Sequence, residues 1–78
     1  MDWLDVYWDD ETVAHVAEHG LTPDDYENAL RNPIGEDVSD SSGRPMRFGF
    51  ALDGRKIAVL FEWIDRVTVL PITAFVVP

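Results

Sequence analysis

The first residues of the chain alternate between two classes of side chain. Over residues 3–8, Leu4, Val6 and Trp8 point one way and their neighbours point the other. Alternation with a period of two, rich in aromatic residues, is typical of a short strand. The sequence therefore predicts an N-terminal strand.

Two helices are expected to follow this strand. An N-cap at Asp9 or Asp10 predicts a helix that runs to about His19, with Gly20 placed to end it. Thr22-Pro23 then opens a second helix, because threonine is a good cap and proline suits the first helical position. Asn32-Pro33 ends that helix, since the residue before a proline disfavours helical geometry.

The second half of the chain is expected to be β-structure. Residues 34–45 are polar and predict a loop with one short strand around Asp37–Asp40. Residues 46–52 and 57–63 alternate as strands do, and Asp53-Gly54 between them is a strong signal for a two-residue hairpin turn. The pattern predicts an antiparallel hairpin.

The chain ends in a further expected strand, from Arg66 to Val77, in which Pro71 indicates a bulge or an edge position. A short strand, two helices and an antiparallel β-meander together predict an α+β fold with the helices on one sheet face. Residues 1–78 are expected to form a single domain. The apolar tail Ala74–Pro78 could pair with a second copy, giving a homodimer, or with a partner.

The charge of the chain is strongly acidic, with 15 Asp plus Glu against 6 Lys plus Arg and a net charge of −9. Nucleic-acid binding depends on Lys and Arg at phosphates, so general affinity for RNA is disfavoured and a basic protein partner is favoured. The chain has no cysteine, which excludes disulfides and thiolate sites. Without a signal peptide or a long apolar run, a cytoplasmic location and no membrane contact are expected.

One short motif raises metal chemistry. His15-Val-Ala-Glu-His19 matches the H-x-x-E-H signature of a class of zinc peptidases. The two histidines are one helical turn apart, but helical spacing places them away from the apolar stripe, and no third ligand can be assigned. Surface histidines are the favoured interpretation, no metal or other cofactor is predicted, and a zinc enzyme remains the minor hypothesis.

The basic residues are concentrated in the hairpin, where four of the six fall between residues 44 and 56. A two-residue turn would pair Ala51 with Lys56 and Arg47 with Leu60, which places Arg47 and Lys56 on one exposed face. Such a surface could hold a phosphate, as metal-free RNA cleavage requires. The candidate catalytic residues are Arg47, Lys56, Glu62 and His19, and the candidate RNA- or partner-binding residues are Arg44, Arg55 and Trp3.

Each candidate also has a structural interpretation. Charges on the exposed face of a hairpin are usually solvated or protect an edge, and Glu62 could form a cross-strand ion pair with Arg47. Arg55 follows Asp53-Gly54 and could belong to the turn, while Arg44 could anchor a loop carboxylate. Trp3 could stack on a base or pack against the C-terminal strand.

The order of several short motifs resembles the BrnT-like toxins and their relatives. The shared features are Trp8-Asp9, His19-Gly20, Asn32-Pro33, Gly43-Arg44, Asp53-Gly54-Arg55 and Ile72-Thr73-Ala74, which together cover nearly the whole chain. The resemblance implies a RelE-like fold and a type II toxin that cleaves RNA and is bound by a small DNA-binding antitoxin.

The sequence departs from this family at its basic positions. His15 and Glu18 stand where the family carries Asn and Lys in the first helix, and Leu70 and Phe75 stand where it carries Arg in the last strand. The resemblance therefore implies a toxin-related component of a toxin–antitoxin pair with RNA cleavage weakened or lost. A non-catalytic, acidic protein-interaction module on the same fold is the alternative, and whether the protein is an enzyme stays open at this point.

Overall fold

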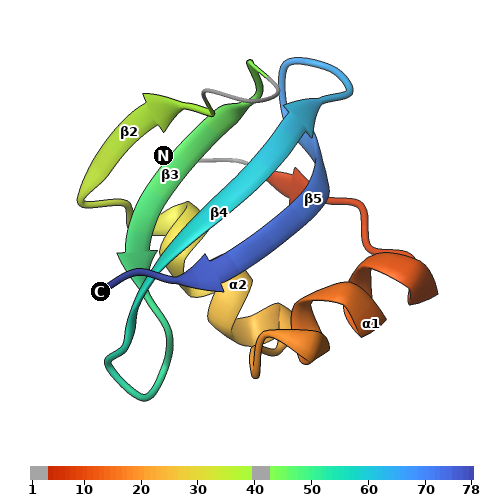
Figure 1. Cartoon of the computed structure of the whole chain (residues 1–78). Coiled ribbons are helices and arrows are strands. Elements are labelled where there is room, and N and C mark those ends of the chain that lie inside the picture. The colour runs from red at the N-terminus through yellow and green to blue at the C-terminus, as the bar shows by residue number, and fades with distance from the viewer. Residues whose placement is uncertain (1–3, 40–42) are drawn as a thin grey trace.

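The computed structural model describes residues 4–39 and 43–78 as a sheet of five strands with two helices packed on it (Figure 1). The elements in chain order are β1 (Asp5–Val6), α1 (Asp10–Glu18), α2 (Pro23–Arg31), β2 (Gly35–Val38), β3 (Pro45–Phe50), β4 (Lys56–Trp63) and β5 (Thr68–Val76). The predicted α+β class and order of elements are confirmed. Asp40 of the expected short strand lies outside the described residues, and the strand found there begins earlier, at Gly35.

The sheet order is β1-β5-β4-β3-β2. β2 to β5 form the expected antiparallel meander, whereas β1 pairs in parallel with β5 through Asp5 with Thr68 and Val6 with Val69. The sheet is therefore mixed. The two helices connect β1 at one edge of the sheet to β2 at the other edge.

Both helices begin as the sequence predicts. The Asp9 carboxylate caps α1 by accepting from the Thr12 backbone N–H at 2.7 Å and from its hydroxyl at 2.9 Å. Thr22 and Asp25 form a reciprocal capping box at the start of α2, which satisfies two otherwise unpaired N–H groups. Each helix has nine residues, and none in the described ranges is long and apolar enough to cross a membrane.

The core lies between the helices and one face of the sheet (Figure 1). The helices contribute Val16 from α1 and Tyr26, Ala29 and Leu30 from α2. The strands contribute Ile57, Val59, Phe61, Val69 and Ala74, all on the same sheet face. One face of the sheet is thus covered by helices, as predicted, and we call the opposite face the open face.

The hairpin turn between β3 and β4 differs from the prediction. The Ala51 N–H donates to the Arg55 carbonyl at 2.8 Å, and the Gly54 N–H donates to the Ala51 carbonyl at 3.0 Å. Residues 52–54 therefore form a three-residue loop, with Gly54 in the left-handed region at φ 92°. The extra loop residue shifts the register by one, so Phe50 pairs with Lys56 and Arg47 with Val59.

A one-residue shift turns every side chain of β3 to the other face. Gly49 faces α2 so closely that an added Cβ would lie 2.6 Å from the Cα of Ala29. Phe48 and Phe50, which alternation alone would assign to the core, point to the open face. The small residue thus allows the helix to approach, and the aromatic residues on either side of it face outward.

Pro71 occupies the kind of position predicted for it. The β4–β5 register shifts between Leu60 and Phe61, which leaves Ile72 as the extra residue of a bulge. The buried Tyr26 hydroxyl donates to the Leu60 carbonyl at 2.5 Å and accepts from the Ile72 N–H. Burial raises the pKa of Tyr26 far above its usual range, so this hydroxyl stays protonated and bridges the bulge.

Candidate functional site

The basic residues of the hairpin do not meet on one surface. Arg47 lies on the helix-covered face, in line with Gly49, whereas Lys56 pairs with Phe50 and lies on the open face. The prediction that Arg47 and Lys56 share a face is therefore wrong. Its cause is the three-residue loop, which shifts the register by one residue.

Arg47 is bound within the structure. Its Nη1 donates to the Leu30 carbonyl at the end of α2 at 3.0 Å, and its Nε lies 3.2 Å from the Glu36 carboxylate. The guanidinium also stands 5.4 Å from the centre of the Phe61 ring. Its side chain is 22% exposed. These contacts join β3 to α2, β2 and β4, which is a structural role.

Arg44 and Glu62 pair with each other across the sheet, with Nε 2.9 Å from Oε1. Glu62 was expected to pair with Arg47 if its role was structural, and the register shift gives it Arg44 instead. Arg44 therefore binds a strand carboxylate, and its expected contact with a loop carboxylate stays a prediction.

Arg55 joins the hairpin loop to the end of α1. Its Nε donates to Asp53 at 2.7 Å, and its Nη2 donates to the Gly20 carbonyl at 3.0 Å. The hydrogen bond from Arg55 lowers the pKa of Asp53, and the same bond raises the pKa of Arg55. The turn role considered for Arg55 is thus the one that the geometry supports.

The remaining predicted residues are scattered. The Lys56 ammonium stands 5.8 Å from the centre of the Phe48 ring on the open face. His19 is exposed at the C-cap of α1, with its ring 5.8 Å from that of His15. Trp3 lies outside the described residues. The catalytic role of Arg47, Lys56, Glu62 and His19 remains a prediction, and these residues do not form one cluster.

The two histidines of the H-x-x-E-H motif are both exposed on α1. Across residues 4–39 and 43–78, no three His, Asp or Glu side chains come close enough together to hold a metal ion. A catalytic zinc site needs three protein ligands. The zinc-enzyme hypothesis therefore gains no support from the described geometry.

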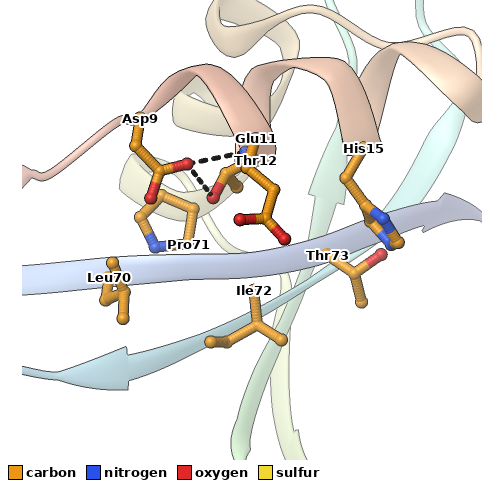
Figure 2. Close-up of a pocket in the computed structure, with 8 residues that line it drawn as sticks. All are labelled: Asp9, Glu11, Thr12, His15, Leu70, Pro71, Ile72 and Thr73. Atoms are coloured by element: carbon orange, nitrogen blue, oxygen red, sulfur yellow. Dashed lines mark hydrogen bonds between the residues drawn. The ribbon is translucent and has the colours of Figure 1, made fainter.

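A groove of about 440 Å³ lies between α1 and β5 (Figure 2). The groove is lined from α1 and its cap by Asp9, Glu11, Thr12 and His15, and from β5 by Leu70, Pro71, Ile72 and Thr73. In Figure 2, Glu11 and His15 reach from the helix toward the strand, while Leu70, Ile72 and Thr73 point to the other side of the strand. The groove thus follows the outer edge of β5.

The groove has an acidic side. Asp9 accepts hydrogen bonds from the Thr12 N–H and then from the Thr12 hydroxyl, and these lower its pKa so that it stays charged near neutral pH. Glu11 is exposed beside it in the first turn of α1. None of the described residues that line the groove is a lysine or an arginine. Its polar side therefore carries negative charge, and its strand side is mostly apolar.

Among the strands of residues 4–39 and 43–78, none pairs with most of the β5 edge that borders this groove. β1 pairs only with Thr68 and Val69, and the Tyr7 N–H adds one bond to the Val69 carbonyl at 2.9 Å. On the other side, the Val77 N–H donates to the Lys56 carbonyl of β4. Since antiparallel residues alternate in direction, the backbone groups of Ala74 and Val76 point away from β4, toward the free edge.

The open face carries a second feature that alternation did not predict. Phe50 and Phe75 are 42% and 39% exposed there. Ala58 is buried although no helix covers it, because its register places it between Phe48 and Phe75. We call the residues Met46, Phe48, Phe50 and Phe75 the open-face patch. Contiguous apolar surface of this kind marks interaction sites in soluble proteins.

Sequence reasoning identified neither the groove nor the open-face patch. One signal for the groove was present, because Pro71 indicated an edge or a bulge. The facing residue Asp9 was considered as a helix cap and as part of Trp8-Asp9, and no prediction was made for Glu11. The signal for the patch was Gly49, since a glycine between two phenylalanines in a strand can mark a close approach of another backbone.

Comparisons with protein-family models, with curated proteins and with solved structures found no match for this chain. The resemblance to BrnT-like toxins therefore stays a prediction from the order of motifs.

Proposed function

We propose that this protein is a non-catalytic protein-binding module whose partner is a small basic protein. The observation that carries the proposal is that the basic side chains of the hairpin do not converge on one site. Arg44, Arg47 and Arg55 are each engaged with a carboxylate at 2.7–3.2 Å, and Arg47 and Lys56 lie on opposite faces of the sheet.

Metal-free RNA cleavage needs cations that converge on one phosphate and a group that moves a proton at the attacking oxygen. Here Glu62 is occupied by Arg44, and Arg47 is bound to the end of α2 and to Glu36. A phosphate that approached Lys56 would meet the aromatic open face rather than a second guanidinium. The geometry therefore favours binding over cleavage.

The surface supports protein binding in two ways. The open-face patch offers apolar side chains that a partner could cover. The net charge of −9 opposes pairing with a second copy and favours association with a basic protein. A small basic partner is also what the BrnT-like resemblance implies, so the toxin–antitoxin hypothesis and the interaction-module hypothesis agree on this point.

An RNA cleavage assay in chelator tests the non-catalytic part of the proposal. Purified protein, with its fold checked by circular dichroism, is incubated with total RNA beside an Arg47→Ala/Lys56→Ala variant. We expect intact RNA in both samples. Cleavage by the wild type that is lost in the variant would replace the proposal with a metal-free ribonuclease.

Coexpression tests the binding part, with the candidate partner taken from any small basic protein that is encoded beside this one. We expect a complex that weakens as salt rises, because charge contributes to association. Phe50→Ser/Phe75→Ser should weaken the complex. Leu52→Ser is the matched control, since Leu52 is 66% exposed on the hairpin loop but lies outside the open-face patch. Equal loss in the control and the double variant would contradict a role for the patch.

A further inference from the structure

The groove between α1 and β5 has the parts of a strand-addition site. Resting on the partner binding proposed above, we propose that an extended, basic segment of the partner enters this groove and pairs with the free edge of β5 as an added strand. Strand addition requires space for a chain, unpaired backbone groups and a surface of matching charge. The groove, the free edge of β5 and the acidic side of α1 meet these three requirements.

The backbone requirement is met by the second half of β5. Beyond Val69 no described strand pairs with this edge, and Ala74 and Val76 direct their N–H and C=O groups outward. Natural sheets usually protect such an edge with charges, prolines or bulges. Here Pro71 and the bulge at Ile72 protect the first part, whereas residues 73–76, Thr-Ala-Phe-Val, carry no charge.

The start of the edge limits where a partner can bind. The Pro71 nitrogen has no hydrogen to donate, so no donor is left unpaired where β1 ends. β1 already occupies the edge at Thr68 and Val69. An added strand would therefore lie in line with β1, beginning after Val69 and extending toward Val76.

The side chains of an added strand would alternate between two environments. Those on the helix side would meet Asp9, Glu11 and His15, which Figure 2 shows above the strand. Those on the other side would lie beside Leu70 and Ile72 and extend the open-face patch next to Phe75. The matching segment alternates lysine or arginine with apolar residues, and this pattern distinguishes the site from a general apolar groove.

Charge decides between a partner and a second copy of this chain. Asp9 and Glu11 face the groove, and its lining in the described part of the chain contains neither lysine nor arginine. The β5 segment of a second copy would bring no basic residue between Val67 and Pro78, and each copy carries a net charge of −9. A basic strand from another protein is the occupant that complements this groove.

A peptide-binding titration tests the inference with the whole protein. The probe is a nine-residue peptide that alternates lysine with valine, and its binding is followed by amide chemical shifts at low salt and at physiological salt. We expect saturable shifts centred on residues 70–76 and α1, with weaker binding at higher salt. A peptide with glutamate in place of lysine should not bind.

Two variants of the same charge change locate the contact. Glu11→Lys reverses a groove carboxylate, whereas Asp10→Lys reverses its neighbour in the first turn of α1, which does not line the groove. The Glu11→Lys variant should raise the dissociation constant of the lysine peptide roughly fivefold to tenfold, about 1 kcal/mol. The Asp10→Lys variant should have an effect of less than about twofold. Equal effects would show general attraction to an acidic surface and would overturn the site.

The strand geometry has its own control. A peptide of the same sequence with N-methyl groups on alternate amides cannot pair along one edge and should lose its binding. Retained binding would overturn strand addition, and dimers formed without peptide and broken by Phe75→Lys would favour a second copy as the occupant. A peptide that fails to bind while RNA also stays intact would remove only this inference, whereas RNA cleavage would remove the proposed function.

Discussion

The two helices meet the sheet in different ways. α2 packs against β3 and β4 with backbone in contact and with its polar side chains bonded to the strands. α1 packs against β5 through a few residues and leaves a groove beside them. The first junction holds the fold together, and the second leaves a surface free for another molecule.

The α2 junction is close and fully bonded. Ala29 touches Gly49 so tightly that there is no room for a side chain on the strand. Asn28 Nδ2 donates to the Phe50 carbonyl at 2.8 Å, and the Asp25 carboxylate accepts from the Leu52 N–H at 2.9 Å. Every one of these bonds ties α2 to the β3 end of the hairpin.

The α1 junction is sparse by comparison. Only Thr12 and Val16 of α1 are buried, and the residues toward the groove, Glu11 and His15, are exposed. No hydrogen bond or ion pair described between side chains joins α1 to β5. The difference indicates that the α2 junction contributes more to the stability of the fold than the α1 junction does, and the following substitutions test the α2 side.

Gly49→Ala should have the largest effect. Its Cβ would stand 2.6 Å from the Ala29 Cα and 2.8 Å from the Ala29 carbonyl oxygen, so α2 must move. We expect a loss of about 3 kcal/mol in the free energy of unfolding, measured by urea denaturation. Gly35→Ala is the control, since its added Cβ would meet only Phe48 at an ordinary 3.8 Å. Similar losses in both variants would contradict a close junction.

Tyr26→Phe should have the next largest effect. Without the hydroxyl, the buried Leu60 carbonyl and Ile72 N–H of the β4–β5 bulge lose their partner. An unsatisfied buried polar group costs about 1–3 kcal/mol, and we expect a loss of about 2 kcal/mol in the free energy of unfolding. The same change at Tyr7, which is 59% exposed, should leave stability within about 0.5 kcal/mol.

Asp25→Asn should destabilise the α2 junction in a pH-dependent way. Burial raises the pKa of Asp25, but hydrogen bonds from Leu52 and Thr22 outweigh this and hold it below its usual value of 3.8. A lowered folded-state pKa gives stability that is present above about pH 4 and lost as the pH falls through the folded-state value. We expect a loss of about 1–2 kcal/mol in the free energy of unfolding at pH 7. The substitution replaces one carboxylate oxygen with an NH2 group, which cannot accept the hydrogen bond from the backbone N–H that it faces.

The Asp25 variant is compared with wild type by urea denaturation from pH 7 to pH 2.5. The gap between them should narrow below about pH 4, as the wild-type carboxyl takes up its proton. Asp24→Asn, at an exposed position in the same helical turn, provides the control and should change stability by less than about 0.5 kcal/mol. A gap that is constant over this range would show that the Asp25 charge does not contribute.

The sequence was sufficient for the elements and for their order. The cap at Thr22, the helix end at Asn32-Pro33 and the bulge or edge signal at Pro71 are local signals, and the structure contains each of them. The local rules could not choose between a two-residue and a three-residue loop around Asp53-Gly54. That single residue decides which face of β3 meets α2, so a local ambiguity became an error about the whole hairpin.

The candidate site depended on this choice. With the register shifted, Arg47 moves to the helix side and Glu62 meets Arg44 rather than Arg47. The groove could not be derived either, because Asp9 and Glu11 approach residues 70–73 only after the complete sheet has formed. Long-range juxtapositions of this kind have no signature in a window of a few residues.

The smallest expected effects separate the two residues that were predicted to act together. Arg47→Ala removes a charge-assisted bond to the Leu30 carbonyl and the contact with Phe61, and should lower the free energy of unfolding by about 1 kcal/mol, since the side chain is partly exposed. Lys56→Ala, on the open face, should change it by less than about 0.5 kcal/mol. The double variant should then equal the sum of the single variants in urea denaturation, because the two side chains lie on opposite faces and share no partner among the described contacts. A coupling energy above about 0.5 kcal/mol would show that the two cations interact, and it would return them to a common site on the hairpin.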